Sequence, residues 1–478
     1  MSLALVDGER AGAVSGATLD VINPATNGVI GRIPRCDGRD VEVAVAAAKR
    51  AAPGWRATEP QQRAAALLAF ADAIEARGAE LARLDSLDNG SPLHEMRTDV
   101  GLATSQIRYL VGLALEVRGQ TMPETPGRLH YTVREPFGVV ARIIAFNHPL
   151  MFAAVKLAAP LLAGNSVILK PSELTSLSAL AMGEDLGRLF PRGVVQILTG
   201  LGDEAGDALV RHPGIPRIAF IGSAATGRRI QASAAAASVK TVTLELGGKN
   251  PIVVFADADL DLAVEGAIRG MNFTWQGQSC GSTSRLLVQR DCYDDFVARV
   301  GQRIAAMRTG PPLDPASDLG AIVSRPQLDK VLSYIEIGRG EQARLVTGGQ
   351  RLTDGDLAAG NFISPALFAD VDPAGRLATE EIFGPVLAAI PFDGYPDALA
   401  IANSVEYGLT ASVFTRDLRT AMAFCRDVEA GYVWVNETSR HFLGAPFGGV
   451  KNSGVGREED LAEIESYTQL KAVNMRFG

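Results

Sequence analysis

The chain has 478 residues, of which 47% are hydrophobic and 21% charged, and a formal net charge of −8. This length exceeds what one hydrophobic core supports, so we expect two or three domains, and the absence of any Lys/Arg run argues against nucleic acid and anionic membranes as partners. The four separated cysteines and five scattered histidines form neither a disulfide framework nor a metal motif, so we expect free thiols and no metal site. No secretory signal and no apolar stretch long enough for a bilayer is visible, which favours the cytoplasm.

The first part of the chain predicts a hairpin followed by helices. Residues 21–33 read as two short strands joined at Asn27-Gly28, because this pair tolerates the positive φ of a tight turn. Apolar residues at three- and four-residue steps predict a helix over 40–53, ending at Pro53. A second helix is predicted over 61–90, ending at Asn89-Gly90.

From residue 137 to 248, short hydrophobic strands alternate with helices. Strands are predicted over 138–146, 166–170, 194–198, 217–221 and 240–246, with helices over 150–164, 171–190, 203–212 and 228–238 between them. This alternation predicts a parallel sheet covered on both faces. Ligands bind beyond the carboxyl ends of such strands, so the loops that follow the first, second and fourth strands should face one crevice.

A second α/β region is predicted over about 249–450. Residues 128–136 and 466–477 alternate like strands outside both cores. They predict either an oligomerisation arm that covers a sheet edge or an internal edge ribbon.

Two residues are candidates for the chemistry. Cys280 lies in "WQGQSCGSTSR", among small and amide side chains. A lone cysteine is most often a small buried hydrophobe, and the alternative is a nucleophile that needs room for its substrate. Glu245 ends a strand in the apolar, glycine-rich "LELGGKNP". Burial there would raise its pKa and suit a general base, whereas the alternative is a solvated strand end.

Two loops at strand ends are candidates for a nucleotide site. "IGSAATG" places Gly222 and Gly227 between a strand and a helix, where backbone N–H groups can hold phosphate, although such a turn needs glycine anyway. "LKPSE" offers Lys170 and Glu173 to the hydroxyls of a ribose, or as a surface ion pair. A carboxylate at this place would repel a 2′-phosphate and favour NAD over NADP.

A third candidate contact comes from "EEIFGPV". Its Glu381 and Phe383 pair a carboxylate with an aromatic face, enough to grip a ribose and brace a flat ring. The alternative for Phe383 is an ordinary core side chain.

"FNHP", "LKPSE", "FIGSAATG", "LELGGKNP", "GQSC", "EEIFGPV" and "PFGGVKNSGVGRE" follow one another along the chain. In this order and spacing the sequence resembles the NAD(P)-dependent aldehyde dehydrogenase superfamily over nearly its full length. The resemblance implies an α/β fold with three parts: a Rossmann-type parallel-sheet cofactor domain over 1–117 and 137–248, an α/β catalytic domain over 249–452, and a small β oligomerisation arm over 118–136 and 453–478. It further implies NAD as cofactor, with NADP less favoured, an aldehyde as substrate, and a homodimer or homotetramer.

The resemblance also assigns roles to matching positions. Cys280 becomes the nucleophile, Glu245 the base that activates thiol and water, and Asn147 the amide of the oxyanion hole. The implied cofactor contacts are Phe146, Lys170, Ser172, Glu173, Gly222, Ser223, Gly227, Leu246, Gly247, Glu381 and Phe383. The implied substrate pocket comprises His148, Met151, Phe152, Val155, Thr274, Arg440, His441, Phe442 and Phe447.

Some positions depart from the family pattern. Phe146 stands where tryptophan is usual, Gln276 where asparagine is common, and His148 where an apolar residue commonly follows the asparagine; Asp460 and Leu461 replace glycine and a small residue. These departures concern the shape of the substrate pocket and not the chemistry. The mix of aromatic and cationic groups predicts a cyclic or aromatic aldehyde whose carboxylate or hydroxyl is held by Arg440 or a histidine; the alternative for Arg440 is a solvated loop residue.

Three other functions remain open at this point. An acylating enzyme would pass the thioester to coenzyme A, but it would not need the hydrolytic base Glu245. A cysteine hydrolase or esterase would leave the cofactor loops unexplained. A catalytically inactive relative would be expected to lack Cys280, Glu245 or Asn147, and all three are present.

Overall fold

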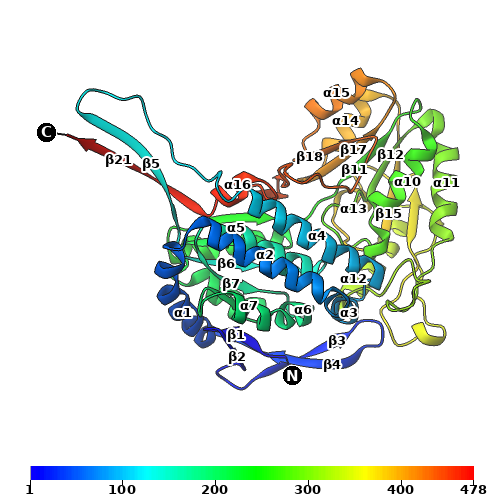
Figure 1. The fold of residues 1–478 in the computed structure, drawn as a ribbon. Helices are drawn as coiled ribbons and strands as arrows, with labels where there is room; N and C mark the ends of the chain where they lie inside the picture. The colour runs from blue at the N-terminus through cyan, green and yellow to red at the C-terminus, as the bar shows by residue number, and fades with distance from the viewer. Residues whose placement is uncertain (1, 478) are drawn as a thin grey trace.

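The computed structural model describes residues 2–477. Two sheets, each covered by helices, make up the body of the molecule, and a two-stranded ribbon projects from it (Figure 1). The α/β fold expected from the sequence is confirmed.

The first sheet has the strand order β2-β1-β8-β7-β6-β9-β10-β20. Its strands are β1 (Ala4–Val6), β2 (Glu9–Ala11), β6 (Val139–Ile143), β7 (Ser166–Lys170), β8 (Val195–Ile197), β9 (Arg217–Ile221), β10 (Thr241–Glu245) and β20 (Gly454–Val455). Strands β8, β7, β6, β9 and β10 are mutually parallel. Their carboxyl ends therefore lie at one edge, where the loops after β6, β7 and β9 come together as predicted.

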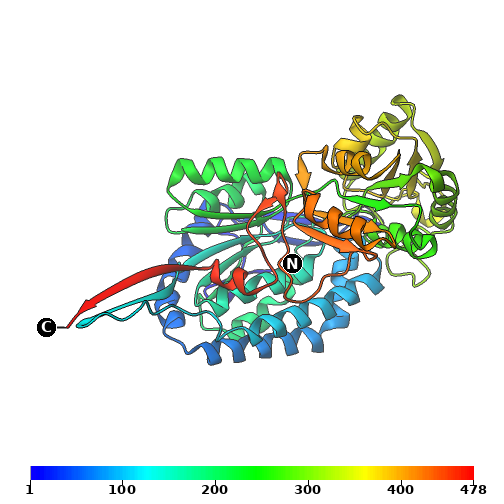
Figure 2. The ribbon, with the colours of Figure 1, turned by 90° about the horizontal axis from the view of Figure 1, so that it is seen from above.

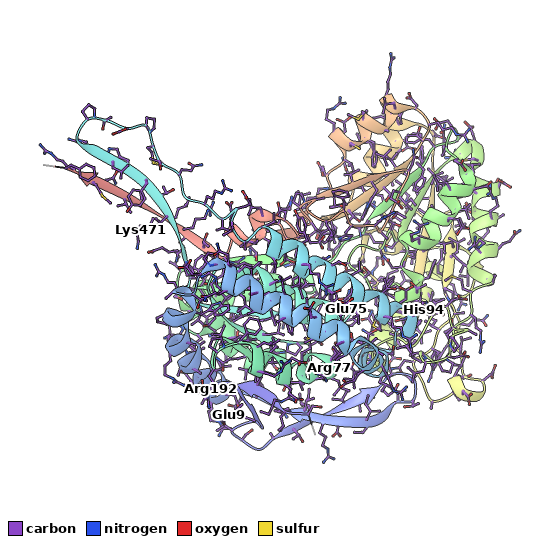
Figure 3. All side chains as sticks on the ribbon, in the orientation of Figure 1. Glu9, Glu75, Arg77, His94, Arg192 and Lys471 are labelled. Carbon is purple, nitrogen blue, oxygen red and sulfur yellow. The ribbon has the colours of Figure 1, made fainter. Side chains whose placement is uncertain are left out.

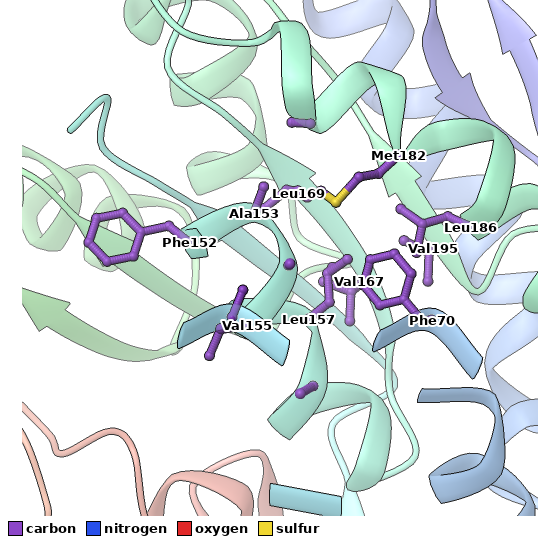
Figure 4. Close-up of a cluster of buried hydrophobic side chains, with 14 of the residues drawn as sticks. Phe70, Phe152, Ala153, Val155, Leu157, Val167, Leu169, Met182, Leu186 and Val195 are labelled. Atoms are coloured by element: carbon purple, nitrogen blue, oxygen red, sulfur yellow. The ribbon is translucent and has the colours of Figure 1, made fainter. Parts of the chain in front are cut away.

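Helices cover both faces of this sheet (Figure 2). They are α1 (Gly38–Arg56), α2 (Pro60–Ala76), α3 (Gly78–Asn89), α4 (Leu93–Gly112), α5 (Pro149–Leu162), α6 (Leu177–Ala181), α7 (Gly183–Leu189), a π-turn (Gly202–Gly206), α8 (Asp207–Arg211) and α9 (Ala224–Ala237). Helix α5 is buried along almost its whole length, which explains its continuous apolar sequence. In Figure 4, Phe70 of α2 packs beside Val167 and Val195 of the sheet, and Phe152 of α5 lies at the opposite end of this cluster.

Three predicted helix boundaries are wrong. The helix predicted to end at Pro53 continues to Arg56, because a proline in the last turn removes only one hydrogen bond and Ala57 N–H still bonds the Pro53 carbonyl. The helix predicted over 61–90 is two helices, separated at Arg77, whose φ of −102° and ψ of 9° leave the helical region. The helix predicted over 171–190 begins only at Leu177 and is interrupted at Met182.

The second sheet has the order β13-β14-β15-β12-β11-β17-β18, in which only β13 is antiparallel to its neighbour. Its strands are β11 (Pro251–Val254), β12 (Arg285–Gln289), β13 (Arg344–Thr347), β14 (Ala366–Ala369), β15 (Val386–Phe392), β17 (Thr410–Phe414) and β18 (Tyr432–Val435). The helices around it are α10 (Leu260–Gly270), α11 (Tyr293–Ala305), α12 (Arg325–Gly340), α13 (Arg376–Thr379), α14 (Tyr395–Asn403) and α15 (Leu418–Asp427). The chain passes from the first sheet to the second through the short loop between β10 and β11.

The two strands predicted outside the cores pair with each other. Strands β5 (Arg128–Pro136) and β21 (Thr468–Arg476) form an antiparallel ribbon that extends away from the body (Figures 1 and 2). Lys471 lies on this ribbon (Figure 3), where its Nζ donates to Glu135 of β5, and the same carboxylate accepts from Arg56 at the end of α1. Within the range expected for the arm, β20 joins the first sheet and α16 (Leu461–Glu465) packs on α5, so the ribbon itself begins at Thr468 on this side.

Two smaller elements complete the fold. The expected N-terminal hairpin is formed by β3 (Thr18–Asn23) and β4 (Gly28–Pro34), with Asn27 at a φ of +54°. Strands β16 (Tyr407–Gly408) and β19 (Val450–Lys451) form a second short pair. Among residues 2–477, every helix is too short or too polar to cross a membrane.

Candidate active site

Cys280 lies in an irregular turn before β12 and is half-buried. Burial raises the pKa of its thiol to about 12, and the negative charges of Glu245 and Glu381 act in the same direction. The nearby backbone N–H groups of Gly281 and Cys280 oppose this rise. A thiol in this state needs a base to become a nucleophile.

Glu245 ends β10 and is 7% exposed. Its Oε2 is buried and has no hydrogen-bond partner. Burial raises its pKa well above the usual value, and the nearby carboxylate of Glu458 raises it further. Gly448 lies against it, since a Cβ there would be 2.8 Å from Oε1. The sequence-based expectation of a carboxylate with a raised pKa is thus confirmed, and it is the property of a general base.

Asn147 directly precedes α5 and is 3% exposed. Its side-chain nitrogen Nδ2 is buried without an acceptor. A buried donor without a partner is costly, and such groups are concentrated at functional sites. This amide is therefore free to donate to a substrate oxygen, the role expected of it.

Glu381 and Phe383 follow α13 at the junction of the two sheets. The Gly248 N–H donates to Glu381 Oε1 at 3.0 Å, and a side chain at Gly247 would overlap the same carboxylate. Burial raises the pKa of Glu381, while Lys330 and Lys249 oppose the rise. Phe383, at a φ of +57°, meets Phe146 edge to face with ring centroids 5.6 Å apart. Four predicted cofactor contacts are thus brought together as two neighbouring pairs.

The predicted adenosine contacts lie at the carboxyl end of β7. Lys170 is 2% exposed and its Nζ is 3.8 Å from Glu173 Oε2. Burial lowers the pKa of Lys170, and Glu173 opposes this. Ser172 shapes the same turn, because its Oγ accepts from Leu174 N–H at 3.3 Å and its carbonyl accepts from the Ser176 hydroxyl.

The predicted pyrophosphate turn precedes α9. Gly222 allows close packing, since a side chain there would overlap Phe220. Ser223 caps α9 and accepts from Thr226 N–H. Gly227 lets the helix approach Leu246, because a Cβ would lie 2.8 Å from Leu246 Cδ2. Gly227 and Leu246 thus set the packing of α9, whose free N-terminal N–H groups face the crevice edge.

The predicted pocket residues form two groups of rings. In the first, His148 lies 5.3 Å from Phe152 and 5.5 Å from Trp275 between ring centroids, and its Nδ1 is 2.9 Å from Asp99 Oδ2. Burial lowers the pKa of His148, but Asp99 outweighs this, so the net shift is upward. Met151 and Val155 belong to the hydrophobic core around this group, and Thr274 lies near Glu95, where it opposes the rise that burial causes in the pKa of that carboxyl.

The second group surrounds a pocket of about 490 Å³ beside β18. His441 is stacked between Tyr432 and Phe447, at centroid distances of 5.5 and 4.5 Å. Arg440 and the exposed Phe442 also line or border this pocket. Gln276, by contrast, is buried and bonded to Ser91, Gln278 and the Thr274 carbonyl, so its departure from the family pattern affects packing.

The sequence of this protein matches known families along its length. The aldehyde dehydrogenase family model covers residues 12–473. A curated relative, aldehyde dehydrogenase tropH of Talaromyces stipitatus, is 43% identical over 479 residues, covering 99% of this chain and 93% of the relative. The chain belongs to the aldehyde dehydrogenase family.

Solved structures agree with this assignment. PnpE from Pseudomonas sp. WBC-3 is 40% identical with a TM-score of 0.97, covering 100% of this chain and 98% of PnpE. AldA of P. syringae, an indole-3-acetaldehyde dehydrogenase solved with NAD⁺ and IAA, is 37% identical with a TM-score of 0.97, covering 100% of this chain and 97% of AldA. This aldehyde dehydrogenase is thus an oxidoreductase that acts on aldehydes.

Sequence reasoning missed several groups in this aldehyde dehydrogenase. Lys249 is 1% exposed with an unpartnered Nζ, and burial lowers its pKa to about 7. Lys330 of α12 also acts on Glu381, yet it carries no motif signal. Trp275 of the "WQGQSC" segment was given no role from the sequence, and its ring lies 5.5 Å from that of His148. In residues 2–477, no cluster of three or more His, Cys, Asp or Glu side chains is arranged to hold a metal.

Proposed function

We propose that this aldehyde dehydrogenase oxidises its substrate with NAD and releases a carboxylic acid, through thiohemiacetal and thioester intermediates on Cys280. The observation that carries the proposal is the pair of buried polar atoms without partners, Glu245 Oε2 and Asn147 Nδ2. One is an acceptor and the other a donor. General-base catalysis and oxyanion stabilisation require these two properties.

In the first step, Glu245 accepts the Sγ proton of Cys280. The sulfur bonds to the aldehyde carbon, and the carbonyl π electrons become an oxyanion. Asn147 Nδ2 donates to that oxygen, an interaction worth about 3–4 kcal/mol in a site that excludes water. The oxyanion relieves the unpartnered state of Asn147, so the interaction is made only once negative charge develops.

The residues present fit a dinucleotide. Lys170 and Glu173 would hold the adenosine ribose, the α9 N-terminus the pyrophosphate, and Glu381 the nicotinamide ribose, with Phe383 beside the ring. Gly247 and Gly248 leave the space that Glu381 occupies. When bound, NAD supplies the hydride acceptor that turns a thiohemiacetal into a thioester.

Before the last step, Glu245 releases to solvent the proton that it took from Sγ. In the last step it takes a proton from water, the hydroxyl adds to the thioester carbon, and the C–S bond breaks. The acid leaves and the thiol regains its proton. A buried carboxylate with a raised pKa suits this alternation, because it takes up and gives up one proton in each half-reaction. An enzyme that passes the acyl group to coenzyme A would not need it.

We further propose a cyclic or aromatic aldehyde as substrate. The two ring groups, around His148 and around His441, support this, because flat faces stack on aromatic side chains. Arg440 or a histidine would then hold a carboxylate or hydroxyl on the substrate. The similarity to AldA, an indole-3-acetaldehyde dehydrogenase, is in line with an aromatic substrate.

The test is a panel of benzaldehyde-type, carboxylated cyclic and straight-chain aldehydes with NAD, NADP and coenzyme A. We expect reduced nicotinamide and free acid with NAD, lower activity with NADP, and no acceleration by coenzyme A. A tenfold preference in kcat/KM for short aliphatic aldehydes would contradict the substrate class. Ester cleavage without NAD and no oxidation of any aldehyde would contradict the reaction.

We also infer that the ribbon of β5 and β21 joins copies of this chain into a dimer or tetramer in the cytoplasm. The ribbon supports this because it leaves backbone edges and side chains such as Leu470 and Phe477 exposed. Light scattering after size exclusion measures the mass. A monomer at micromolar concentration would contradict the inference.

A further inference from the structure

The loop between β10 and β11 touches all three parts of the catalytic site. It begins after Glu245, donates from Gly248 N–H to Glu381, and ends at Asn250, which directly precedes β11. Asn250 is 2% exposed. A side chain at Gly248 would lie 2.5 Å from Asn250 Oδ1, so glycine there gives the asparagine its place.

The Asn250 side chain is fully hydrogen-bonded. Its Nδ2 donates to the Cys280 carbonyl at 2.8 Å and to the Ser282 carbonyl at 3.0 Å. Its Oδ1 accepts from Thr410 N–H at 3.0 Å, at the start of β17. The backbone carbonyl of Asn250 accepts from Arg285 N–H at 3.1 Å. One residue therefore fixes the nucleophile turn on both sides and ties it to two strands.

The bond to the Cys280 carbonyl has a consequence for the sulfur. A trans peptide is planar, and its C=O and N–H point in opposite directions. When the Cys280 carbonyl is held on Asn250, the Gly281 N–H of the same peptide must face away from Asn250. The Gly281 N–H lies near the Cys280 sulfur and favours the thiolate.

We propose that Asn250 is a positioning residue for the nucleophile: it holds the Cys280–Gly281 peptide so that the Gly281 N–H stays directed at Sγ. The role rests on the proposed function of Cys280. Without this anchor the peptide can rotate, the N–H is lost to the sulfur, and the thiolate becomes less accessible. Asn250 itself does not contact the reacting atoms.

The chain contains a matched control. Asn165 is fully buried, its Nδ2 donates to the carbonyls of Pro160 and Tyr467 at 3.1 and 3.0 Å, and its Oδ1 accepts from Gly138 N–H at 3.0 Å. It makes the same three bonds as Asn250, but at the amino-terminal edge of the first sheet, opposite the crevice. Its replacement should weaken the fold without acting on Cys280.

The experiment compares Asn250→Asp with Asn165→Asp in the full-length enzyme. A buried, protonated aspartate offers at most one donor in place of two. The measurements are the alkylation rate of Cys280 by iodoacetamide from pH 6 to 10, followed by mass spectrometry of its peptide, and the thermal midpoint. We expect Asn250→Asp to slow alkylation at neutral pH about tenfold and to move the profile to higher pH, as loss of a charge-assisted hydrogen bond predicts. Asn165→Asp should lower the thermal midpoint by a similar amount but change the alkylation rate of Cys280 less than about twofold.

Equal slowing in both variants, or a wild-type profile in Asn250→Asp, would overturn the positioning role. If Asn250→Asp does not fold, Asn250→Ser replaces it, with the same expected shift and the same contrary result. Cys280→Ala is measured in parallel to separate the two hypotheses. Retained aldehyde oxidation in Cys280→Ala rejects the proposed function, whereas its loss together with normal alkylation in the Asn250 variants rejects only the role of Asn250.

Discussion

Two buried glutamates near the first sheet behave in opposite ways. Glu245 and Glu458 are 7% and 6% exposed. Glu458 accepts from Arg142 at 2.8 Å and lies 2.6 Å from Lys156 Nζ. Burial raises the pKa of Glu458, but these two cations outweigh it and the net shift is downward; the pKa of Glu245, which has no such partner, rises well above its usual value.

The comparison distinguishes a carboxylate that stabilises the fold from one that is left free to take part in a reaction. The negative charge of the Glu458 carboxylate is neutralised by Arg142 of β6 and Lys156 of α5, so it ties the segment after β20 to this strand and this helix. Glu245 is left with an unsatisfied oxygen in the same region, and Glu458 makes its ionisation harder. Two carboxylates whose environments push their pKa values apart are a common way to divide roles. If the roles are divided in this way, replacing Glu245 should mainly affect catalysis and replacing Glu458 should mainly affect stability.

The largest effect is expected for Cys280→Ala. Because no other group can form the covalent intermediate, aldehyde oxidation should fall by roughly 10⁴-fold or more. Steady-state formation of reduced nicotinamide measures it. Cys425→Ala, on the outer helix α15, is the control and should retain activity; comparable turnover in both variants would refute the role of Cys280.

Glu245→Gln should lower kcat by roughly 10²- to 10⁴-fold, the range for loss of a general base. Its free energy of unfolding should not decrease, because an unpartnered buried carboxyl is replaced by a neutral amide of the same shape. Kinetics and chemical denaturation of the same preparation measure both. A variant that unfolds more easily and turns over normally would place Glu245 among the structural residues.

Glu458→Gln should show the reverse balance. Arg142 and Lys156 would lose their counter-charge, at a cost of about 3–5 kcal/mol in the free energy of unfolding. Urea denaturation measures this loss. Unchanged stability would mean that the pair does not hold the fold, and the contrast with Glu245 would disappear.

Asn147→Ala removes the proposed oxyanion donor. We expect kcat to fall roughly 10²- to 10³-fold with little change in KM, because the bond forms only in the transition state. Asn452→Ala, an exposed asparagine, is the control. A rise in KM at constant kcat would indicate ground-state binding instead.

The smallest effect is the pH dependence of stability. The folded-state pKa of Glu245 is raised, so its contribution is present at low pH and is lost as pH rises through that value. The pKa of Glu458 is lowered, so its contribution is present above its ordinary pKa and is lost as pH falls. The thermal midpoint of Glu245→Gln should therefore rise relative to that of the wild type as the pH increases. A constant difference at all pH values would contradict the assigned shift.

Local sequence determined much of the first sheet, and the order of its motifs supplied the candidates for the reacting groups. Strands β6, β7 and β9 are buried on both faces, so they are mainly apolar runs that a sequence reveals directly. The ends of β6, β7 and β10 carry Asn147, Lys170 and Glu245 because a parallel sheet gathers its functional groups at one edge. The small neighbours of Cys280 left its role open, and it was the resemblance carried by the ordered motifs that pointed to a nucleophile. Helix ends were less predictable, because the continuation of α1 past Pro53 and the break between α2 and α3 at Arg77 depend on how these helices pack.

Only the tertiary structure decided which of these groups are paired with a charge and which are held by a hydrogen bond. The Glu458–Arg142 bond joins residues 316 positions apart, and the Asn250–Cys280 bond joins the loops that precede β11 and β12. Neither spacing leaves a pattern along the chain. Whether a carboxylate is paired or unpaired, and whether a peptide is held or free, follows from burial and three-dimensional neighbours, because the cost of an ionised group depends on what surrounds it.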